Sequence, residues 1–299
     1  RRTNWFETVG REGKAVRERV GLLDLTSFTK HEISGDGAEE YLNNMIANRL
    51  PAKQGGTVLG HALTESGGVE SEFTITRDGG KVYAVSSGAA ERHDHDVLLR
   101  TLPRDGRVTL KNITLELGTL VVCGPRARDL LSKITDADLS NDGFPWLTSQ
   151  RISVAGVSLL ALRVNFVGEL GWELHHPIDQ QVQLFDAIVE AGEEFGLRHF
   201  GMYAMESMRL EKSYRMWGSD LTREYSILEA GLSRFVRLKK DEFAGKEALL
   251  KQKETGVPQE FVTLEIDATD ADAIGSEPIF RNGEMIGRAP SGCYGNSIG

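Results

Sequence analysis

Cysteine is scarce in this chain of 299 residues, which contains only Cys123 and Cys293. The two lie far apart, and neither belongs to a CxxC pair or to a Cys/His spacing typical of zinc ligands. The sequence therefore predicts neither a disulfide framework nor a structural zinc site, and a reducing compartment is the expected location. Hydrophobic runs are also short: none approaches the length that crosses a bilayer, so no membrane segment is expected.

Clusters of positive charge are missing too. The formal net charge is −9, and the 35 Lys and Arg residues are scattered among 44 Asp and Glu residues. Nucleic acids and acidic membrane surfaces both favour a basic face, so neither is expected as a partner. The composition, 40% hydrophobic and 26% charged, is ordinary for a globular protein. A chain of this length buries a substantial core and is expected to divide into two or three domains.

The common catalytic motifs are absent as well. The chain has no GxGxxG phosphate loop, no GxSxG nucleophile elbow and no HExxH metal motif. His93 and His95 flank Asp94 at the start of a polar helix, where exposure to solvent explains them better than a metal does. His175 and His176 are neighbours on a strand, so they are expected to point to opposite faces and to share no metal. Any chemistry must therefore depend on carboxylates or on a bound cofactor.

Hydrophobic periodicity predicts helices and strands in a mixed order. Helices are expected at 12–19, 38–46, 91–102, 126–133, 182–192 and 202–214. Strands are expected at 21–25, 30–35, 57–63, 69–76, 81–86, 117–122 and over most of 150–174. Short strands beyond residue 261 indicate a small β-barrel or sandwich. Because strands and helices do not alternate regularly, the fold class is predicted to be α+β rather than doubly wound.

The stretch 164–174 combines two glycines, two carboxylates and an aromatic residue toward each end. Gly168 and Gly171 indicate a tight turn or a close approach of the backbone to another group. Strand alternation sends the side chain of Glu173 to the face opposite its two apolar neighbours, toward a cavity or water. A carboxylate in a cavity suits a heterocycle with paired N–H donors. An exposed glutamate on a hairpin is the simpler alternative.

Two further groups of polar residues are candidates for chemistry. Glu70 and Glu72 are two residues apart on a predicted strand, so both are expected on the same side of it. A carboxylate there could hold or move a proton on a substrate amine, or the pair could simply form a wet strand face. On and just after the helix 202–214, Arg209 and Arg215, with Tyr203 and Tyr214, could clamp an anionic tail, although mixed surface charge explains them equally well.

Taken together and in order, these motifs resemble the folate-binding aminomethyltransferase family, whose best-known member is the T-protein of the glycine cleavage system. The matching pieces are 21–28, 35–42, 64–72, 123–128, 166–174, 208–212, 228–232, 243–249 and 291–295. The segments 2–6, 168–174 and 214–222 look most like the C-terminal half of dimethylglycine and sarcosine dehydrogenases. In those proteins a flavin domain precedes the folate module and oxidises an N-methyl amine.

The resemblance implies an α+β fold of three domains, in a cloverleaf-like ring around a central folate cavity. The expected segments are 1–52 (first part of domain 1), 53–111 (inserted domain 2), 112–235 (remainder of domains 1 and 2) and 236–299 (an incomplete C-terminal β-barrel). The chain is expected to be a piece of a longer protein, with FAD bound only in a preceding domain. A methylamine-type molecule is the implied substrate, and the cytoplasm, or the mitochondrial matrix of a eukaryote, is the implied location.

The resemblance also assigns roles to individual residues. Glu173 matches the carboxylate that binds the pterin ring of tetrahydrofolate, and Glu72 falls where the family has a catalytic Asp. Phe166 falls where this branch has a Tyr at the folate site. Arg209 belongs to the family's Arg-Leu-Glu helix and, with Tyr203, is a further candidate for cofactor binding.

Two of these positions depart from the family pattern. Glu72 in place of Asp moves the carboxylate outward by about 1.5 Å, and a misplacement of that size can lower a rate on the order of 10²-fold. Phe166 in place of Tyr removes a hydroxyl that could hydrogen-bond to substrate. Two alternatives follow, a folate-binding scaffold without transfer activity and a folate-dependent demethylase of a non-amine donor. Restoring Asp and Tyr should raise turnover in an enzyme and change little in a scaffold.

Overall fold

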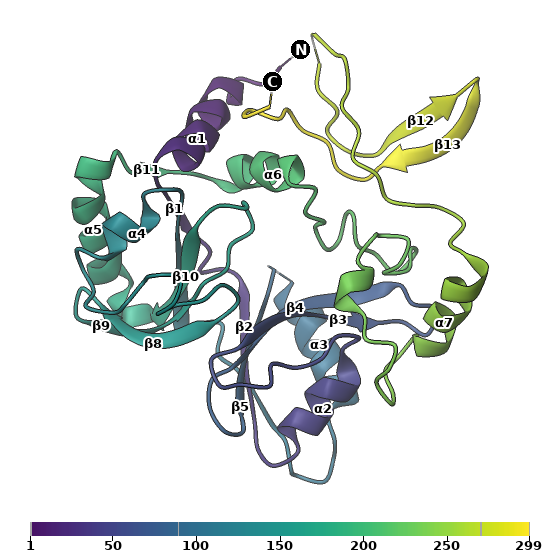
Figure 1. Cartoon of the computed structure of the whole chain (residues 1–299), viewed down its shortest axis with the longest axis horizontal. Coiled ribbons are helices and arrows are strands. Elements are labelled where there is room, and N and C mark those ends of the chain that lie inside the picture. The colour runs from purple at the N-terminus through teal and green to yellow at the C-terminus, as the bar shows by residue number, and fades with distance from the viewer. Residues whose placement is uncertain (1, 89, 270, 299) are drawn as a thin grey trace.

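The computed structural model describes residues 2–88, 90–269 and 271–298. Its parts form three lobes around a common centre (Figure 1): a six-stranded sheet with its helices, a five-stranded sheet with its helices, and a C-terminal region. Within the described ranges, no helix is long and apolar enough to cross a membrane. The mixed architecture confirms the α+β class.

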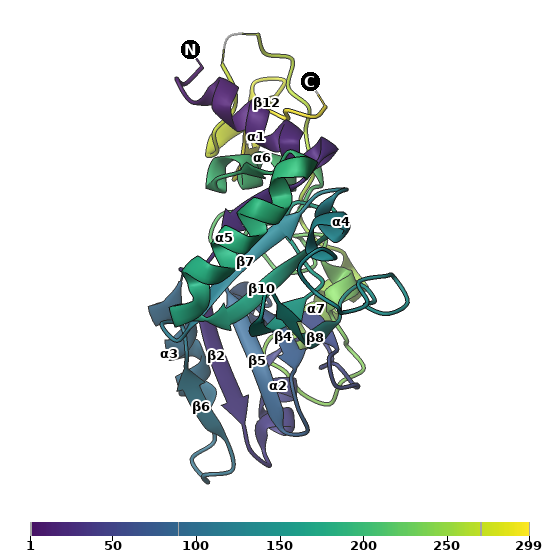
Figure 2. The same ribbon diagram turned by 90° about the vertical axis from the view of Figure 1, so that its left-hand side faces the viewer.

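The first lobe is built on the six-stranded sheet. Across the sheet the strands are β11 (Arg198–His199), β1 (Gly21–Asp24), β7 (Leu117–Cys123), β10 (Gly171–Pro177), β9 (Val157–Leu162) and β8 (Ser149–Val154). All neighbours are antiparallel except β1 and β11. Helices α4 (Ala127–Leu131) and α5 (Gln181–Gly192) pack on one face, and α1 (Phe6–Glu18) and α6 (Met202–Glu211) pack on the other. Figure 2 shows α1 and α6 at the top, with the five-stranded sheet at the bottom.

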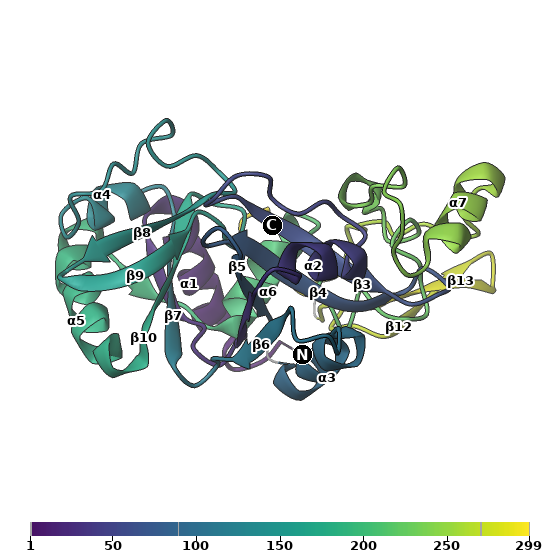
Figure 3. The same cartoon turned by 90° about the horizontal axis from the view of Figure 1, so that it is seen from below.

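The second lobe is the antiparallel five-stranded sheet. Its strands are β3 (Thr57–Leu63), β4 (Val69–Arg77), β5 (Val82–Ser87), β2 (Thr29–Ser34) and β6 (Thr109–Asn112). Helices α2 (Ala38–Met45) and α3 (Glu91–Thr101) bury their apolar residues against one face, and α2 lies in front of these strands in Figure 3. The division into segments at 52 and 111 stays a prediction. The hydrogen bonds themselves place β2, from the first segment, in one sheet with β3–β6.

The C-terminal region contains η3 (Ser233–Phe235), α7 (Lys246–Thr255) and the hairpin of β12 (Glu277–Arg281) and β13 (Glu284–Ala289). An apolar cluster that includes Ile227, Val236 and Leu249 packs against Leu63 and Val69 of the five-stranded sheet. Within the described part of 236–299, the hairpin forms a separate two-stranded sheet rather than a closed barrel.

Most elements lie where periodicity predicts them, because their apolar residues repeat at clear intervals. The predicted helix 12–19 starts earlier, at Phe6, and the predicted run 150–174 is three strands with an irregular segment at 163–170. β6, β11 and α7 have no counterpart in the prediction. The first two are short, and α7 has one fully buried residue, Leu249, so its apolar periodicity is weak.

Candidate functional site

Glu173 lies in the middle of β10. Its neighbours Trp172 and Leu174 belong to the core between the sheet and helices α4 and α5. Glu173 is registered opposite Val121 on β7, a residue of the core that α1 and α6 cover. The predicted alternation is thus confirmed: Glu173 faces away from its apolar neighbours, and 19% of its side chain is exposed.

Glu173 has a histidine partner on its own strand. His175 follows two residues later and therefore lies on the same face, with Nε2 3.2 Å from Glu173 Oε2. Its Nδ1 lies 3.3 Å from the hydroxyl oxygen of Thr119, the residue opposite it on β7. A neutral ring with the proton on Nε2 donates to Glu173 and accepts from Thr119, so one tautomer satisfies both contacts.

His176 points the other way, as predicted. Its Nδ1 is 2.9 Å from the Leu174 carbonyl oxygen and its Nε2 is 2.6 Å from Gln181 Oε1, and the ring is fully buried. The two adjacent histidines thus contact different groups on opposite faces of β10. Only His175 belongs to the surroundings of Glu173.

A buried cation lies within electrostatic range of Glu173. Burial lowers the pKa of Lys30 to about 8, although the negative charges of Asp24 and, to a smaller extent, of Glu173 raise it. The ammonium donates to the carbonyl oxygens of Thr26 and Phe28, in the turn that leads from β1 into β2. The sequence signal for Lys30 is weak, because it is one polar residue in a mostly polar strand that also contains His31 and Glu32.

Glu72 also has a histidine partner, in this case across two strands. It lies on β4 directly opposite His61 on β3, and the distance between Glu72 Oε2 and His61 Nε2 is 2.8 Å. The His61 side chain has no exposed surface, whereas 19% of the Glu72 side chain is exposed. Sequence reasoning missed His61 because no local motif marks it.

The expectation that Glu70 and Glu72 face the same side is wrong, because β4 contains a bulge. The register with β3 shifts by one residue at this point, which leaves Glu70 as the extra residue. Glu70 bonds Arg100 of α3 at 3.0 Å, and Ser71 bonds Asp94 of the same helix at 2.9 Å. Both therefore face α3, while Glu72 faces His61.

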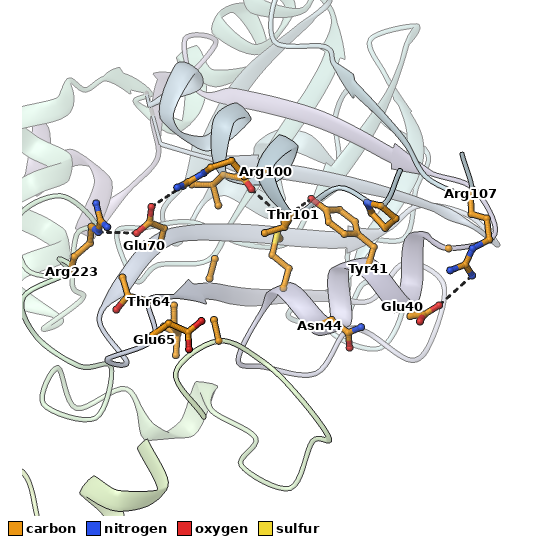
Figure 4. A pocket seen from close by; sticks show the side chains of 17 residues that line it. Glu40, Tyr41, Asn44, Thr64, Glu65, Glu70, Arg100, Thr101, Arg107 and Arg223 are labelled. Atoms are coloured by element: carbon orange, nitrogen blue, oxygen red, sulfur yellow. Dashed lines mark hydrogen bonds and ion pairs between the residues drawn. The ribbon is translucent and has the colours of Figure 1, made fainter. Parts of the chain in front are cut away.

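A cavity of about 590 Å³ lies beside this bulge, between α2 and α3. Figure 4 shows Glu70 between Arg100 and Arg223 at one end, and Glu40 paired with Arg107 at the other. With Glu65, the lining of the cavity contains three glutamates and three arginines, so its charges balance. No residue that the sequence assigns to folate lines this cavity.

Phe166 lies in the irregular segment before β10. Asn165 Oδ1 accepts from the backbone N–H groups of Val167 and Gly168, and Gly168 has a φ of +74°. The tight turn predicted from Gly168 is thus confirmed. The Phe166 ring stacks on Tyr214, with centroids 6.0 Å apart. This aromatic pair is half-buried.

Gly171 confirms the second expectation for this stretch, a close approach of the backbone. A Cβ atom on Gly171 would lie 2.5 Å from Cys123 Cβ on the neighbouring strand β7. Only glycine therefore fits where β10 begins to pair with β7. Since Glu173 follows two residues later, this contact helps to set its place in the sheet.

Arg209 is fully buried in α6. Its Nη1 donates to the Tyr214 carbonyl oxygen at 2.8 Å and to Asp220 Oδ2 at 2.5 Å, and its Nη2 donates to Glu206 and to Ser291 Oγ at 2.7 Å. These bonds join α6 to two later segments of the chain. A role of Arg209 in cofactor binding stays a prediction.

Tyr203 is 64% exposed and stacks on Trp5, with ring centroids 5.5 Å apart. It precedes Arg209 by six residues on α6, which is about 9 Å along the helix axis. Tyr203 and Arg209, both candidates for cofactor binding, therefore lie apart on the helix. A role of Tyr203 in cofactor binding also stays a prediction.

The segment 213–222 links the parts of the candidate site. At one end Tyr214 stacks on Phe166, and at the other the Trp217 indole N–H donates to the Glu70 carbonyl oxygen at 3.1 Å. One continuous segment thus connects the Phe166 turn with strand β4, which carries Glu72. These contacts join residues that are distant in the sequence.

Comparison with known proteins agrees with this architecture. Residues 1–240 match the family described as GCVT N-terminal domain. The chain is 42% identical over 301 residues to the mitochondrial dimethylglycine dehydrogenase of Homo sapiens, covering 100% of this chain and 35% of that protein. It is 31% identical to an aminomethyltransferase of Thermoanaerobacter sp. (strain X514), covering 98% of this chain and 79% of that protein.

A solved structure gives the same fold. The glycine cleavage system aminomethyltransferase T from Bartonella henselae superposes with a TM-score of 0.82 at 22% identity, covering 97% of this chain and 78% of that one. The match confirms the fold expected from the sequence. The chain spans about a third of the length of the dimethylglycine dehydrogenase that it matches.

Proposed function

The chain belongs to the GCVT N-terminal domain family, and on that premise we propose that it transfers a one-carbon unit to tetrahydrofolate. The matches confirm the resemblance to aminomethyltransferases and to dimethylglycine dehydrogenase. The observation that carries the proposal is the placement of Glu173. Its partly exposed carboxylate is held on β10 by His175, on the face opposite its core-forming neighbours.

The residues around Glu173 fit the pterin of tetrahydrofolate. A carboxylate accepts two parallel hydrogen bonds, which suits the amino group and adjacent ring N–H of a pterin. His175 holds Oε2 of this carboxylate, so its orientation is set before a ligand arrives. The half-buried rings of Phe166 and Tyr214 offer flat apolar surface to the rest of the molecule.

Glu72 would perform the proton chemistry. Bound tetrahydrofolate supplies the nucleophilic nitrogen. Glu72 would accept the proton that this nitrogen loses when it forms a C–N bond to the iminium carbon of the oxidised amine. Since His61 occupies Oε2, the proton would be accepted at Oε1. Return of that proton from Glu72 to the donor amine would let the amine leave as its own C–N bond to that carbon breaks.

The substrate is proposed to be an N-methyl amine such as dimethylglycine. Its oxidation would take place in an FAD domain outside this chain, consistent with the 35% share of the dimethylglycine dehydrogenase that the chain covers. The carbon released there would be captured on tetrahydrofolate here. The proposed location is the mitochondrial matrix if the protein is eukaryotic, and the cytoplasm otherwise.

Calorimetric titration of tetrahydrofolate into the chain and into Glu173→Ala tests the binding half of this proposal. We expect clear binding to the wild type, its loss in Glu173→Ala, and no change in Glu284→Ala, which removes an exposed carboxylate on β13. Absence of binding to folded wild-type protein would refute a folate site.

A folate-binding module without transfer activity is the second candidate, favoured by Phe166, which lacks the hydroxyl that this branch usually has. Such a module would bind tetrahydrofolate through Glu173 as well. One experiment distinguishes the two candidate functions. The longer protein that would contain this chain and the FAD domain is given a ¹³C-methyl amine to oxidise in the presence of tetrahydrofolate. An enzyme places the label on folate, whereas a binding module leaves it as formaldehyde. Labelled folate formed from a sulfonium or aryl ether instead would identify a non-amine donor.

A further inference from the structure

His61 and Glu72 form a cross-strand pair that the proposed reaction does not yet explain. They are directly opposite on β3 and β4, two strands that lie side by side in Figure 1. Side chains in such a pair stand on the same face of the sheet. His61 is fully buried and Glu72 is partly exposed, so the carboxylate lies between a buried partner and the accessible side.

The surroundings of the ring favour one arrangement of its protons. Nε2 of His61 lies 2.8 Å from Glu72 Oε2, whereas Nδ1 is buried and has no hydrogen-bond partner among the described residues. An imidazolium, or a tautomer protonated at Nδ1, would bury an unpaired N–H donor. A proton on Nε2 leaves only an unpaired acceptor, which is the less costly arrangement. The geometry therefore places a proton on Nε2, which donates to the carboxylate.

Packing fixes the direction of this donor. Phe235 of η3 packs against the His61 ring, with centroids 5.7 Å apart and planes at 56°. Residues from the C-terminal region thus restrict rotation of a side chain on β3. A restricted ring holds Glu72 Oε2 in one place and leaves Oε1 for other contacts.

We propose that His61 is a positioning residue, which orients the Glu72 carboxylate so that Oε1 meets the reacting amine. This inference rests on the proposed function. It also reverses the effect expected for Glu72→Asp from the sequence. An aspartate is shorter by about 1.5 Å, so it would withdraw from His61 and lose the bond. The longer side chain at this position is matched to its histidine.

Nitrogen-15 NMR of the histidine rings tests the hydrogen bond in the wild-type chain. We expect His61 to be protonated at Nε2 and unprotonated at Nδ1 at neutral pH. In Glu72→Gln the Nε2 signal should move, because the charged acceptor is gone. A proton on Nδ1 at neutral pH would overturn the inference.

Two variants of His61 test its positioning role. They are made in the longer protein that would contain both this chain and the FAD domain, and that protein is allowed to oxidise an N-methyl amine in the presence of tetrahydrofolate. His61→Gln places an amide N–H near the position of Nε2, whereas His61→Asn places it near Nδ1, too short to reach Glu72. In His61→Gln we expect the rate of carbon capture on folate to stay within about threefold of the wild-type rate. In His61→Asn and in Glu72→Asp we expect this rate to fall on the order of 10²-fold. Formaldehyde release should rise correspondingly while amine oxidation stays constant.

The affinity for tetrahydrofolate separates positioning from a structural effect. It should be unchanged in His61→Asn, because the Glu173 site is untouched. Equal capture by the Gln and Asn variants, or a parallel loss of affinity, would overturn the inference. Failure of the wild type to bind tetrahydrofolate would instead overturn the proposed function and the catalytic part of this inference. The ring tautomer would still decide whether the hydrogen bond exists.

Discussion

Glu173 and His175 share one face of β10, with His175 Nε2 3.2 Å from Glu173 Oε2. The relationship is local, because residues two apart on a regular strand without a bulge face the same side. Thr119 completes it from the neighbouring strand, at 3.3 Å from His175 Nδ1. The orientation of Glu173 therefore depends on a chain of three side chains from two strands.

The first prediction concerns Thr119. Thr119→Val keeps the shape of the side chain but removes the donor to His175 Nδ1, so the ring loses its preference for donating to Glu173. Loss of one such hydrogen bond is worth about 1 kcal/mol, and tetrahydrofolate affinity should fall roughly fivefold. Thr119→Ser, which keeps a hydroxyl, is the control. Equal calorimetric affinities for the Val variant and the wild type would contradict the prediction.

The second prediction concerns the ion pair of Arg209 and Asp220, both almost fully buried. Asp220→Ala leaves a buried guanidinium with one carboxylate fewer, so the free energy of unfolding should fall by about 3–5 kcal/mol. Asp105→Ala removes one of the two carboxylate partners of Arg107 on the surface and should produce no measurable change. Urea denaturation of both variants measures the difference. Similar midpoints would show that Arg209 does not depend on Asp220.

The third prediction is a loss of stability in mild acid caused by His31. Burial, and then the nearby His95, lower the pKa of His31 from 6.5 to about 4. Between these values the unfolded chain binds more protons than the folded chain, so stability falls as pH drops from 6.5 toward 4. The full effect of this residue is roughly 3 kcal/mol.

Chemical denaturation at pH 7 and pH 4.5 tests this effect. The partners of His31 are His95, whose ring stacks on it with Nδ1 3.1 Å from His31 Nε2, and the nearby carboxylate of Glu91. His31→Gln removes the titrating group and should show a smaller loss between the two pH values. An identical loss in this variant would assign the acid sensitivity to other groups.

The fourth prediction is a gain of stability in mild alkali. Burial lowers the pKa of Lys240 from 10.5 to about 8, and the Lys30 pKa falls equally far, again through burial. Above pH 8 the folded chain releases these protons while the unfolded chain retains them, so stability rises with pH up to about 10. Lys240→Met and Lys30→Met should each reduce the slope measured by thermal unfolding at pH 8, 9 and 10. A wild-type stability that falls over this range would contradict the prediction.

Lys240→Met should also lower stability at neutral pH. The ammonium donates to the carbonyl oxygens of Asn43, Ile46 and Asn48, at and just beyond the C-terminal end of α2. Without it these carbonyls lose a donor that joins the C-terminal region to the end of α2. Unfolding at pH 7 measures this effect separately from the slope above pH 8.

Local patterns in the sequence predicted much of this molecule. Alternation along 171–177 placed Glu173 on the face opposite Trp172 and Leu174, as the structure shows. Gly168 has the positive φ expected of a tight turn. The family resemblance covered the chain and gave the fold that the comparison with the aminomethyltransferase structure confirms.

Local patterns failed where distant segments meet. The bulge that turns Glu70 toward α3 arises from a shift in register between β3 and β4, and strict alternation cannot reveal it. The burial of Arg209 depends on Asp220 and Ser291, which follow it by many residues. Neither feature is encoded in the residues adjacent to it.

The sequence by itself therefore determined the class of fold, most of its helices and strands, and the strand that carries Glu173, because these follow from periodicity over a few residues. The tertiary structure alone decided that His61 lies against Glu72 and that Glu70 lies with Arg100 instead. The physical reason is that strand register and side-chain partners are set by contacts between segments far apart in the chain. Such contacts leave no short-range pattern.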